Sequence, residues 1–123
     1  MPRTLVLLFC DSNGRAPLIE WLKDLPEKVQ DKCVARIRRL AGMGHELRRP
    51  EADFLRDGIY ELRVGFGGVN YRMLYFFHGN IAAIVCNGLM KEREVPPIEI
   101  ERAIARRKQY LTDPLHHSLE MNL

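Results

Sequence analysis

Apolar residues fall into short runs and helical stripes along the first third of the chain. An apolar run over residues 4–10, followed by the turn-forming cluster Asp11-Ser-Asn-Gly14, predicts a buried first strand. Pro17 is suited to the first turn of a helix, and the apolar residues after it keep helical spacing. Pro26 ends that helix and can begin the next, which the pattern predicts over 27–41. The two helices are expected to form an antiparallel hairpin.

The pattern changes to strands in the second half of the chain. Residues 59–64 and 69–77 are separated by the glycine-rich loop 65–68, and a tight turn leads to a further strand over 81–86. A final helix is predicted over 97–111, with acidic residues near its beginning and basic residues near its end, as the helix dipole favours.

Two segments lack a clear pattern. Residues 45–57 are expected to be a polar connector, and residues 112–123 a flexible C-terminal tail. Residues 1–111 then form a single domain, as the chain length suggests. The element order β-α-α-β-β-β-α indicates an α+β fold, with a small, mainly antiparallel sheet, a helical hairpin on one face and a C-terminal helix.

Charged residues interrupt two of the predicted strands. Alternation along a strand puts Glu61 and Arg63 on one face of the first hairpin strand, and Arg72 must share that face, because a slip by one residue would bury it among apolar side chains. With Val64 opposite Val69, Glu61 faces Arg72 in a cross-strand ion pair.

The last strand is expected to extend this charged face. A two-residue turn at Gly79-Asn80 would set Asn87 opposite Arg72, and Lys91 follows just beyond the strand. The same register places three apolar residues on the face: Ile81, Ala83 and Val85. Two interpretations stay open, a solvated face with one salt bridge, or a concave basic surface for a phosphate-rich ligand, which arginine suits through its planar fork of donors.

Composition narrows the class of protein. The chain is 46% hydrophobic and 28% charged, typical of a globular protein, and its net charge of +3 favours nucleic acid only weakly. Three widely spaced cysteines in apolar runs predict buried, reduced thiols in a cytoplasmic protein. No Cys/His cluster predicts a metal site, and His116-His117 is a weak candidate. No apolar run approaches the roughly 20 residues of a membrane span.

Four blocks of sequence are more specific than the composition. They are Ile59-Tyr-Glu-Leu-Arg63, Tyr71-Arg-Met-Leu-Tyr-Phe76, Gly88-Leu-Met-Lys91 and Pro97-Ile-Glu-Ile-Glu-Arg-Ala103. In this order and spacing they resemble the RelE/ParE toxin superfamily, in particular the phage-derived HigB-like toxins. The segment Pro17-Leu-Ile-Glu-Trp-Leu22 also matches the first helix of that family, so the resemblance spans about residues 4–111 and implies a RelE-like fold.

The resemblance implies the toxin of a type II toxin–antitoxin system. Such toxins enter the ribosomal A site and cut mRNA there, as endoribonucleases (mRNA interferases) that use no metal and no other cofactor. The implied partner is a helix-turn-helix antitoxin, and operator DNA would be reached only through the complex with it. The reaction is attack by a 2′-hydroxyl on the neighbouring phosphate, which DNA cannot undergo.

Residue roles follow from that chemistry. The expected phosphate-binding and charge-stabilising residues are Arg63, Arg72 and Lys91, and Glu61 serves either as a general base or as the group that orients Arg72. Three arginines of the predicted connector are expected to contact RNA, unless they are simply solvated: Arg48, Arg49 and Arg56.

The loop after the last strand departs from the family pattern. Leu89 replaces the usual aromatic residue, Glu92 the second lysine and Val95 a further basic residue, so the loop has less positive charge than is usual. Two alternatives therefore stand beside the endoribonuclease. One is a non-catalytic interaction module bound by the antitoxin, its activity lost through Glu92 and Val95. The other is a ParE-like inhibitor of DNA gyrase.

Overall fold

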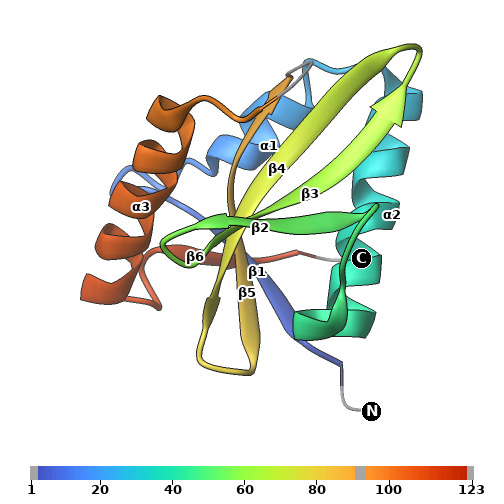
Figure 1. Cartoon of the computed structure of the whole chain (residues 1–123). Helices are drawn as coiled ribbons and strands as arrows, with labels where there is room; N and C mark the ends of the chain where they lie inside the picture. The colour runs from blue at the N-terminus through green and yellow to red at the C-terminus, as the bar shows by residue number, and fades with distance from the viewer. Residues whose placement is uncertain (1–2, 91–93, 122–123) are drawn as a thin grey trace.

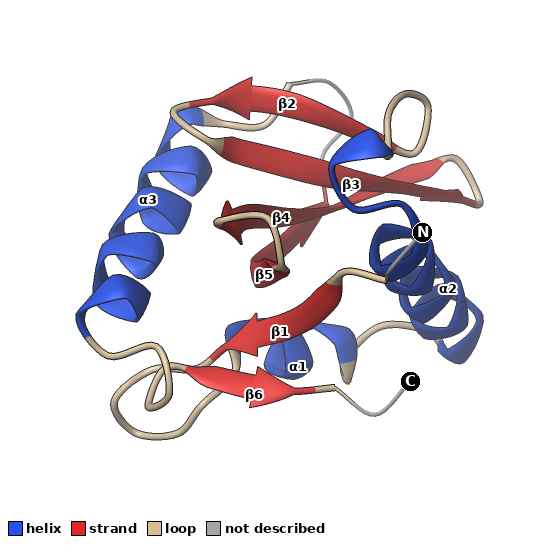
Figure 2. Ribbon diagram, turned by 90° about the horizontal axis from the view of Figure 1, so that it is seen from below, coloured by secondary structure: helices blue, strands red, loops and turns tan. Residues whose placement is uncertain are grey.

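A computed structural model describes residues 3–90 and 94–121 of the chain, which form one mixed six-stranded sheet with helices on both faces (Figures 1 and 2). The elements in chain order are β1 (Leu5–Phe9), α1 (Pro17–Leu22), α2 (Glu27–Met43), a 3-10 turn η1 (Gly44–Glu46), β2 (Ala52–Arg56), β3 (Ile59–Phe66), β4 (Val69–His78), β5 (Ala82–Met90), α3 (Pro97–Thr112) and β6 (Ser118–Glu120). The strand order is β2-β3-β4-β5-β1-β6. β1 runs parallel to β5, and the other neighbours are antiparallel. The predicted α+β fold is therefore confirmed.

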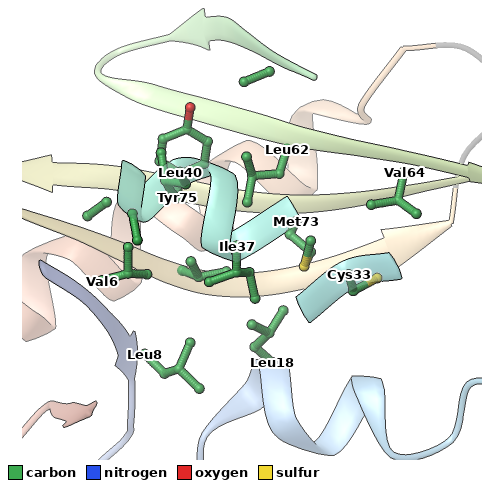
Figure 3. Packing of buried hydrophobic residues seen from close by; sticks show 14 of the residues in the cluster. Val6, Leu8, Leu18, Cys33, Ile37, Leu40, Leu62, Val64, Met73 and Tyr75 are labelled. Atoms are coloured by element: carbon green, nitrogen blue, oxygen red, sulfur yellow. The ribbon is translucent and has the colours of Figure 1, made fainter. Parts of the chain in front are cut away.

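The helical hairpin α1–α2 covers one face of the sheet. The apolar stripe of α2, including Cys33, Ile37 and Leu40, is fully buried and shares a core with Leu62 of β3 and Met73 of β4 (Figure 3). These side chains point inward because helical spacing on α2 and alternation along the strands put them on facing surfaces. The stripes are core, as expected.

The C-terminal helix α3 covers the opposite face, so the sheet lies between α2 and α3 (Figure 2). Ile100 and Ala103 of α3 form a second core with Leu74 and Phe76 of β4 and Ile84 of β5. Side chains alternate along β4, so Leu74 and Phe76 lie on the same face of this strand as Arg72. Helix α3 thus covers the apolar part of the charged face.

Two strands were not predicted. The segment 45–57 is not simply a connector, because it contains β2, which adds the edge strand next to β3. The segment 112–123 is not simply a tail, because β6 pairs with β1, and buried His117 places Nδ1 2.9 Å from the carbonyl oxygen of Cys10. Both strands are short and lack apolar alternation, so the sheet next to them, and not their own sequence, determines their conformation.

The hairpin of β3 and β4 is longer than predicted. Its turn is only Gly67-Gly68, both at positive φ, which glycine adopts without strain. The strands therefore reach Phe66 and Val69, and Arg63, not Glu61, lies opposite Arg72. The register is displaced by an even number of residues, so the predicted sharing of a face by the charged residues is retained.

A bulge in β5 makes its pairing with β4 differ from the predicted register. Leu74 pairs with Asn87 and Tyr75 with Val85, which leaves Cys86 as the extra residue. Asn87 does lie on the charged face, although opposite Leu74 and not Arg72. Ala83 and Val85 belong to the core under α1–α2, so their predicted placement on the charged face is wrong, as is that of Ile81, which precedes the strand.

All three cysteines are free and buried, as predicted: Cys10, Cys33 and Cys86. Burial raises the pKa of Cys33 to about 11 and that of Cys86 to about 12, so both thiols stay protonated and unreactive at neutral pH. In the described part of the chain, no helix has the length and hydropathy that crossing a membrane would require.

Gly88 has a packing role that its position in β5 explains. The indole ring of Trp21, on α1, lies so close that a Cβ at Gly88 would overlap its six-membered ring. We expect Gly88→Ala to lower the free energy of unfolding by about 1–3 kcal/mol, because the indole must move out of a packed core. Gly42→Ala is the matched control, since nothing lies within 4 Å of a Cβ there. Urea unfolding measures both, and equal stability of the two variants would contradict the prediction.

Candidate functional site

Glu61 lies at the centre of the charged face. Its side chain is only 2% exposed, and its Oε1 accepts hydrogen bonds from Arg63 Nε, at 2.5 Å, and from Arg72 Nη1. The predicted ion pair between Glu61 and Arg72 is thus confirmed, although it runs diagonally between the strands. The side chain of Arg72 is 12% exposed and that of Arg63 is 33% exposed, so of these two guanidinium groups only that of Arg63 is substantially open to solvent.

A second carboxylate extends the cluster to the edge strand β2. Asp53, which pairs with Glu61 across β2 and β3, accepts from Arg63 Nη2 at 3.3 Å and from Arg49 Nε and Nη2 at 2.9 and 2.7 Å. The hydrogen bonds from Arg49 are the main reason that the pKa of Asp53 lies below its ordinary value, and Arg63 adds a smaller effect. We call these five residues the arginine–carboxylate network; its three arginines and two carboxylates give a net charge of +1.

A pocket of about 320 Å³ opens over the network. Glu61, Arg63 and Arg72 line it from β3 and β4, Asp53 lines it from β2, and Ile100 lines it from the first turns of α3. We call it the site pocket. A guanidinium beside a small pocket offers paired donors to an anion with several oxygens, such as a phosphate group.

Two buried donors on this face lack a hydrogen-bond partner among the described residues, Arg72 Nε and Asn87 Nδ2. Asn87 is 4% exposed and uses its Oδ1 to accept from Cys86 Sγ at 3.1 Å. Unpaired buried donors are uncommon in folded proteins and are satisfied by ordered water or by a ligand with acceptor oxygens.

The predicted catalytic residues divide into two groups. Glu61, Arg63 and Arg72 come together as the sequence suggested. Lys91 lies outside the described residues, as does Glu92, one of the departures from the family pattern. Val95 is buried and lines the site pocket just before α3, where it contributes apolar surface and no charge.

The three arginines predicted to contact RNA have different surroundings. Arg49 belongs to the network. Arg56 lines the site pocket but pairs with Asp57, at 2.6 Å, and with Glu101 of α3, at 2.7 Å. Arg48 is exposed and makes no ion pair with any residue in 3–90 or 94–121, so of the three it is the most available to a ligand.

Sequence reasoning missed Asp53 and did not assign Arg49 to the charged face. Both omissions come from the missed strand β2, because only the pairing of Asp53 with Glu61 brings them to the network. The weak signal is the stretch 52–56, in which polar and apolar residues mix after Pro50. The sequence also did not predict the contact of Arg106 on α3, whose Nη1 donates to the carbonyl oxygen of Cys86 at 3.2 Å.

Metal-binding side chains do not gather in the described ranges 3–90 and 94–121, where no group of three or more His, Cys, Asp or Glu residues could hold an ion. His116 pairs with Asp113, at 3.3 Å, and His117 packs its ring against Phe9. Both histidines thus have structural partners.

Comparison with known protein families gives a match over most of the chain. The family described as phage derived protein Gp49-like (DUF891) matches residues 20–108, which is more than half of the chain and includes β2 to β5 and most of α3. No curated protein matches the chain.

Proposed function

Because the chain belongs to the Gp49-like family of phage-derived proteins, within the RelE/HigB toxin-like group, we propose that it is the toxin of a type II toxin–antitoxin system. Its activity would be ribosome-dependent cutting of mRNA, without a metal or another cofactor. The observation that supports this most directly is the arginine–carboxylate network at the site pocket, which presents two guanidinium groups side by side.

The reaction needs few groups from the protein. The 2′-oxygen of one nucleotide forms a bond to the adjacent phosphorus, and the bond from phosphorus to the 5′-oxygen of the next nucleotide breaks. The products are a 2′,3′-cyclic phosphate and a free 5′-hydroxyl. One proton leaves the 2′-hydroxyl and one is delivered to the 5′-oxygen, while extra negative charge builds up on the phosphate oxygens.

Arg63 and Arg72 would stabilise that negative charge. Their guanidinium groups are held by a buried carboxylate on rigid strands, so little reorganisation is needed when the charge develops. The Nε of Arg72 has no hydrogen-bond partner among residues 3–90 and 94–121, and we propose a phosphate oxygen as its acceptor. Lys91 is proposed as a third cation, from its place in the matching sequence block.

Glu61 is better suited to positioning than to proton transfer. Its Oε1 already accepts hydrogen bonds from two guanidinium groups, so this oxygen is held by Arg63 and Arg72. We therefore assign Glu61 the task of orienting Arg63 and Arg72. The base that accepts the 2′-proton is then a group other than Glu61.

The same proposal assigns partners and location. The ribosome and mRNA supply the substrate, a helix-turn-helix antitoxin neutralises the toxin, and operator DNA is bound only by the antitoxin complex. All of these are found in the cytoplasm, where three free thiols would also persist.

Expression of the chain without any antitoxin tests the proposal. We expect growth arrest, with new 5′-hydroxyl ends in ribosome-bound mRNA. In Arg63→Ala the cutting rate should fall about tenfold, because this partly exposed cation is weakened by solvent. The fold should survive, since Glu61 keeps its bond to Arg72. Mapping of 5′ ends in mRNA measures the cutting.

Three other outcomes would each count against the endoribonuclease. Absence of arrest would indicate a non-catalytic module. Arrest with DNA damage and intact mRNA would indicate inhibition of gyrase. Cutting that is unchanged in Arg63→Ala would move the activity away from the site pocket.

A further inference from the structure

A second pocket lies on the other side of the edge strand β2. Its volume is about 400 Å³, within the range of about 300–1,000 Å³ that is typical of small-molecule sites. Buried Leu47 and Ala52 line it together with the aromatic rings of Phe54 and Tyr60, and Arg48 and Arg49 add positive charge. We call it the aromatic pocket.

The aromatic rings of this pocket form a connected group. Phe54 meets Tyr60 edge to face at a centroid distance of 5.1 Å, and Tyr60 stacks on Tyr75 at 5.3 Å. Tyr60 also contacts Phe77, over which His45 stacks at 3.6 Å. The inner rings are fixed by the core, and Phe54 is 52% exposed on a strand, so its ring is presented to solvent.

The charge around the aromatic pocket favours an anionic ligand. Arg48 is exposed and unpaired within the described residues, and no acidic residue other than Asp53, which Arg49 already neutralises, lines the pocket. An exposed aromatic ring next to a free arginine matches the two parts of a nucleotide, because a base stacks on a ring and a phosphate accepts from a guanidinium group.

The aromatic pocket and the site pocket meet at β2. Arg49, Asp53 and Phe54 line both pockets, so one nucleic-acid strand that crosses the edge of the sheet can contact both of them. We infer that the aromatic pocket binds one unpaired base of a single-stranded RNA whose backbone continues into the site pocket. This inference rests on the proposed function, and it adds a contact to a base at a distance from the phosphate that reacts in the site pocket.

Binding of a short RNA to the isolated chain tests the inference without any cutting. The probe is a fluorescent five-nucleotide RNA with 2′-O-methyl groups, which cannot undergo 2′-attack, and anisotropy reports its dissociation constant. Phe54→Ala should weaken binding about tenfold, in line with the loss of one stacked base. Phe54→Trp should restore the affinity. The exposed position of Phe54 keeps the variant folded.

An abasic version of the same oligonucleotide separates stacking from charge. Phe54→Ala should leave its affinity unchanged, whereas Arg48→Ala should weaken both oligonucleotides, because both keep their phosphates. Arg15→Ala is the matched loss of charge elsewhere, since the side chain of Arg15 lines neither pocket, and it should have a smaller effect than Arg48→Ala.

Two results would overturn the base site. One is equal weakening of both oligonucleotides by Phe54→Ala. The other is that Phe54→Ala changes the affinity for neither oligonucleotide. If the same variant then binds the antitoxin more weakly, the pocket is a protein-docking surface instead. Base-dependent binding in a chain that does not cut mRNA would support the base site while rejecting the proposed function. If the chain cuts mRNA but its binding does not depend on the base, the proposed function is supported and the base site is rejected.

Discussion

Replacing Glu61 with alanine is expected to destabilise the protein by about 3–5 kcal/mol, the largest change in stability that we predict. The reason is the burial of its partner. Arg72 is 12% exposed, and without Glu61 its charge would have no carboxylate within ion-pair distance among the described residues. Arg63 would lose less, because it still reaches Asp53. Urea unfolding, followed by circular dichroism, measures the loss.

Two further variants make this result specific. Glu101→Ala removes a carboxylate from an exposed pair with Arg56, and it should cost far less. Combining Glu61→Leu with Arg72→Leu should recover much of the stability lost in Glu61→Ala, because no uncompensated buried charge remains. If Glu61→Ala costs no more than Glu101→Ala, the buried pair does not have the structural weight assigned to it here.

Arg72→Ala is expected to reduce the rate of mRNA cutting by about 10²–10³-fold, the loss typical for one preorganised donor to a developing anion. The effect should exceed that of Arg63→Ala, because Arg72 is less exposed and solvent weakens its charge less. The rate is measured on purified ribosomes programmed with a defined mRNA, at saturating toxin.

The controls separate chemistry from folding. Arg72→Lys keeps the charge but loses the planar fork, so it should recover part of the rate and no more. Arg102→Ala removes a paired arginine from the exposed side of α3 and should cut at the normal rate. Circular dichroism must show that Arg72→Ala is folded at the assay temperature. A folded Arg72→Ala that cuts as fast as the unaltered chain would rule out a role for Arg72 in the reaction.

The central hairpin could be predicted because its chemistry is local. Alternation along β3 and β4 leaves Arg72 no apolar face to share, so the common face of Glu61, Arg63 and Arg72 follows from burial alone. The residue opposite each charged side chain on the neighbouring strand could not be predicted in this way. It depends on whether the turn takes two glycines or four residues, and on a bulge at Cys86, neither of which the apolar pattern records.

The two outer strands could not be predicted for a different reason. β2 and β6 each have a single neighbour in the sheet, so few of their residues need to be apolar. Their pairing is imposed by β3 and β1. The part of the site that depends on β2 was lost with it, namely Asp53, the network position of Arg49, and the exposed ring of Phe54 between the two pockets.

The position of β1 between β5 and β6 has a consequence for how the protein is made. Leu8 pairs with Val85 on one side and with Leu119 on the other, so the first strand must wait for partners that are synthesised much later than itself. Such distant pairings form late, after the local hairpins. The nascent chain can therefore close the β3–β4 hairpin early, whereas β1 takes its place in the sheet only after its partners β5 and β6 have been synthesised. For a protein proposed to attack translating ribosomes, the arginine–carboxylate network is thus assembled before the site pocket is complete, because the pocket also needs Ile100 of the later helix α3.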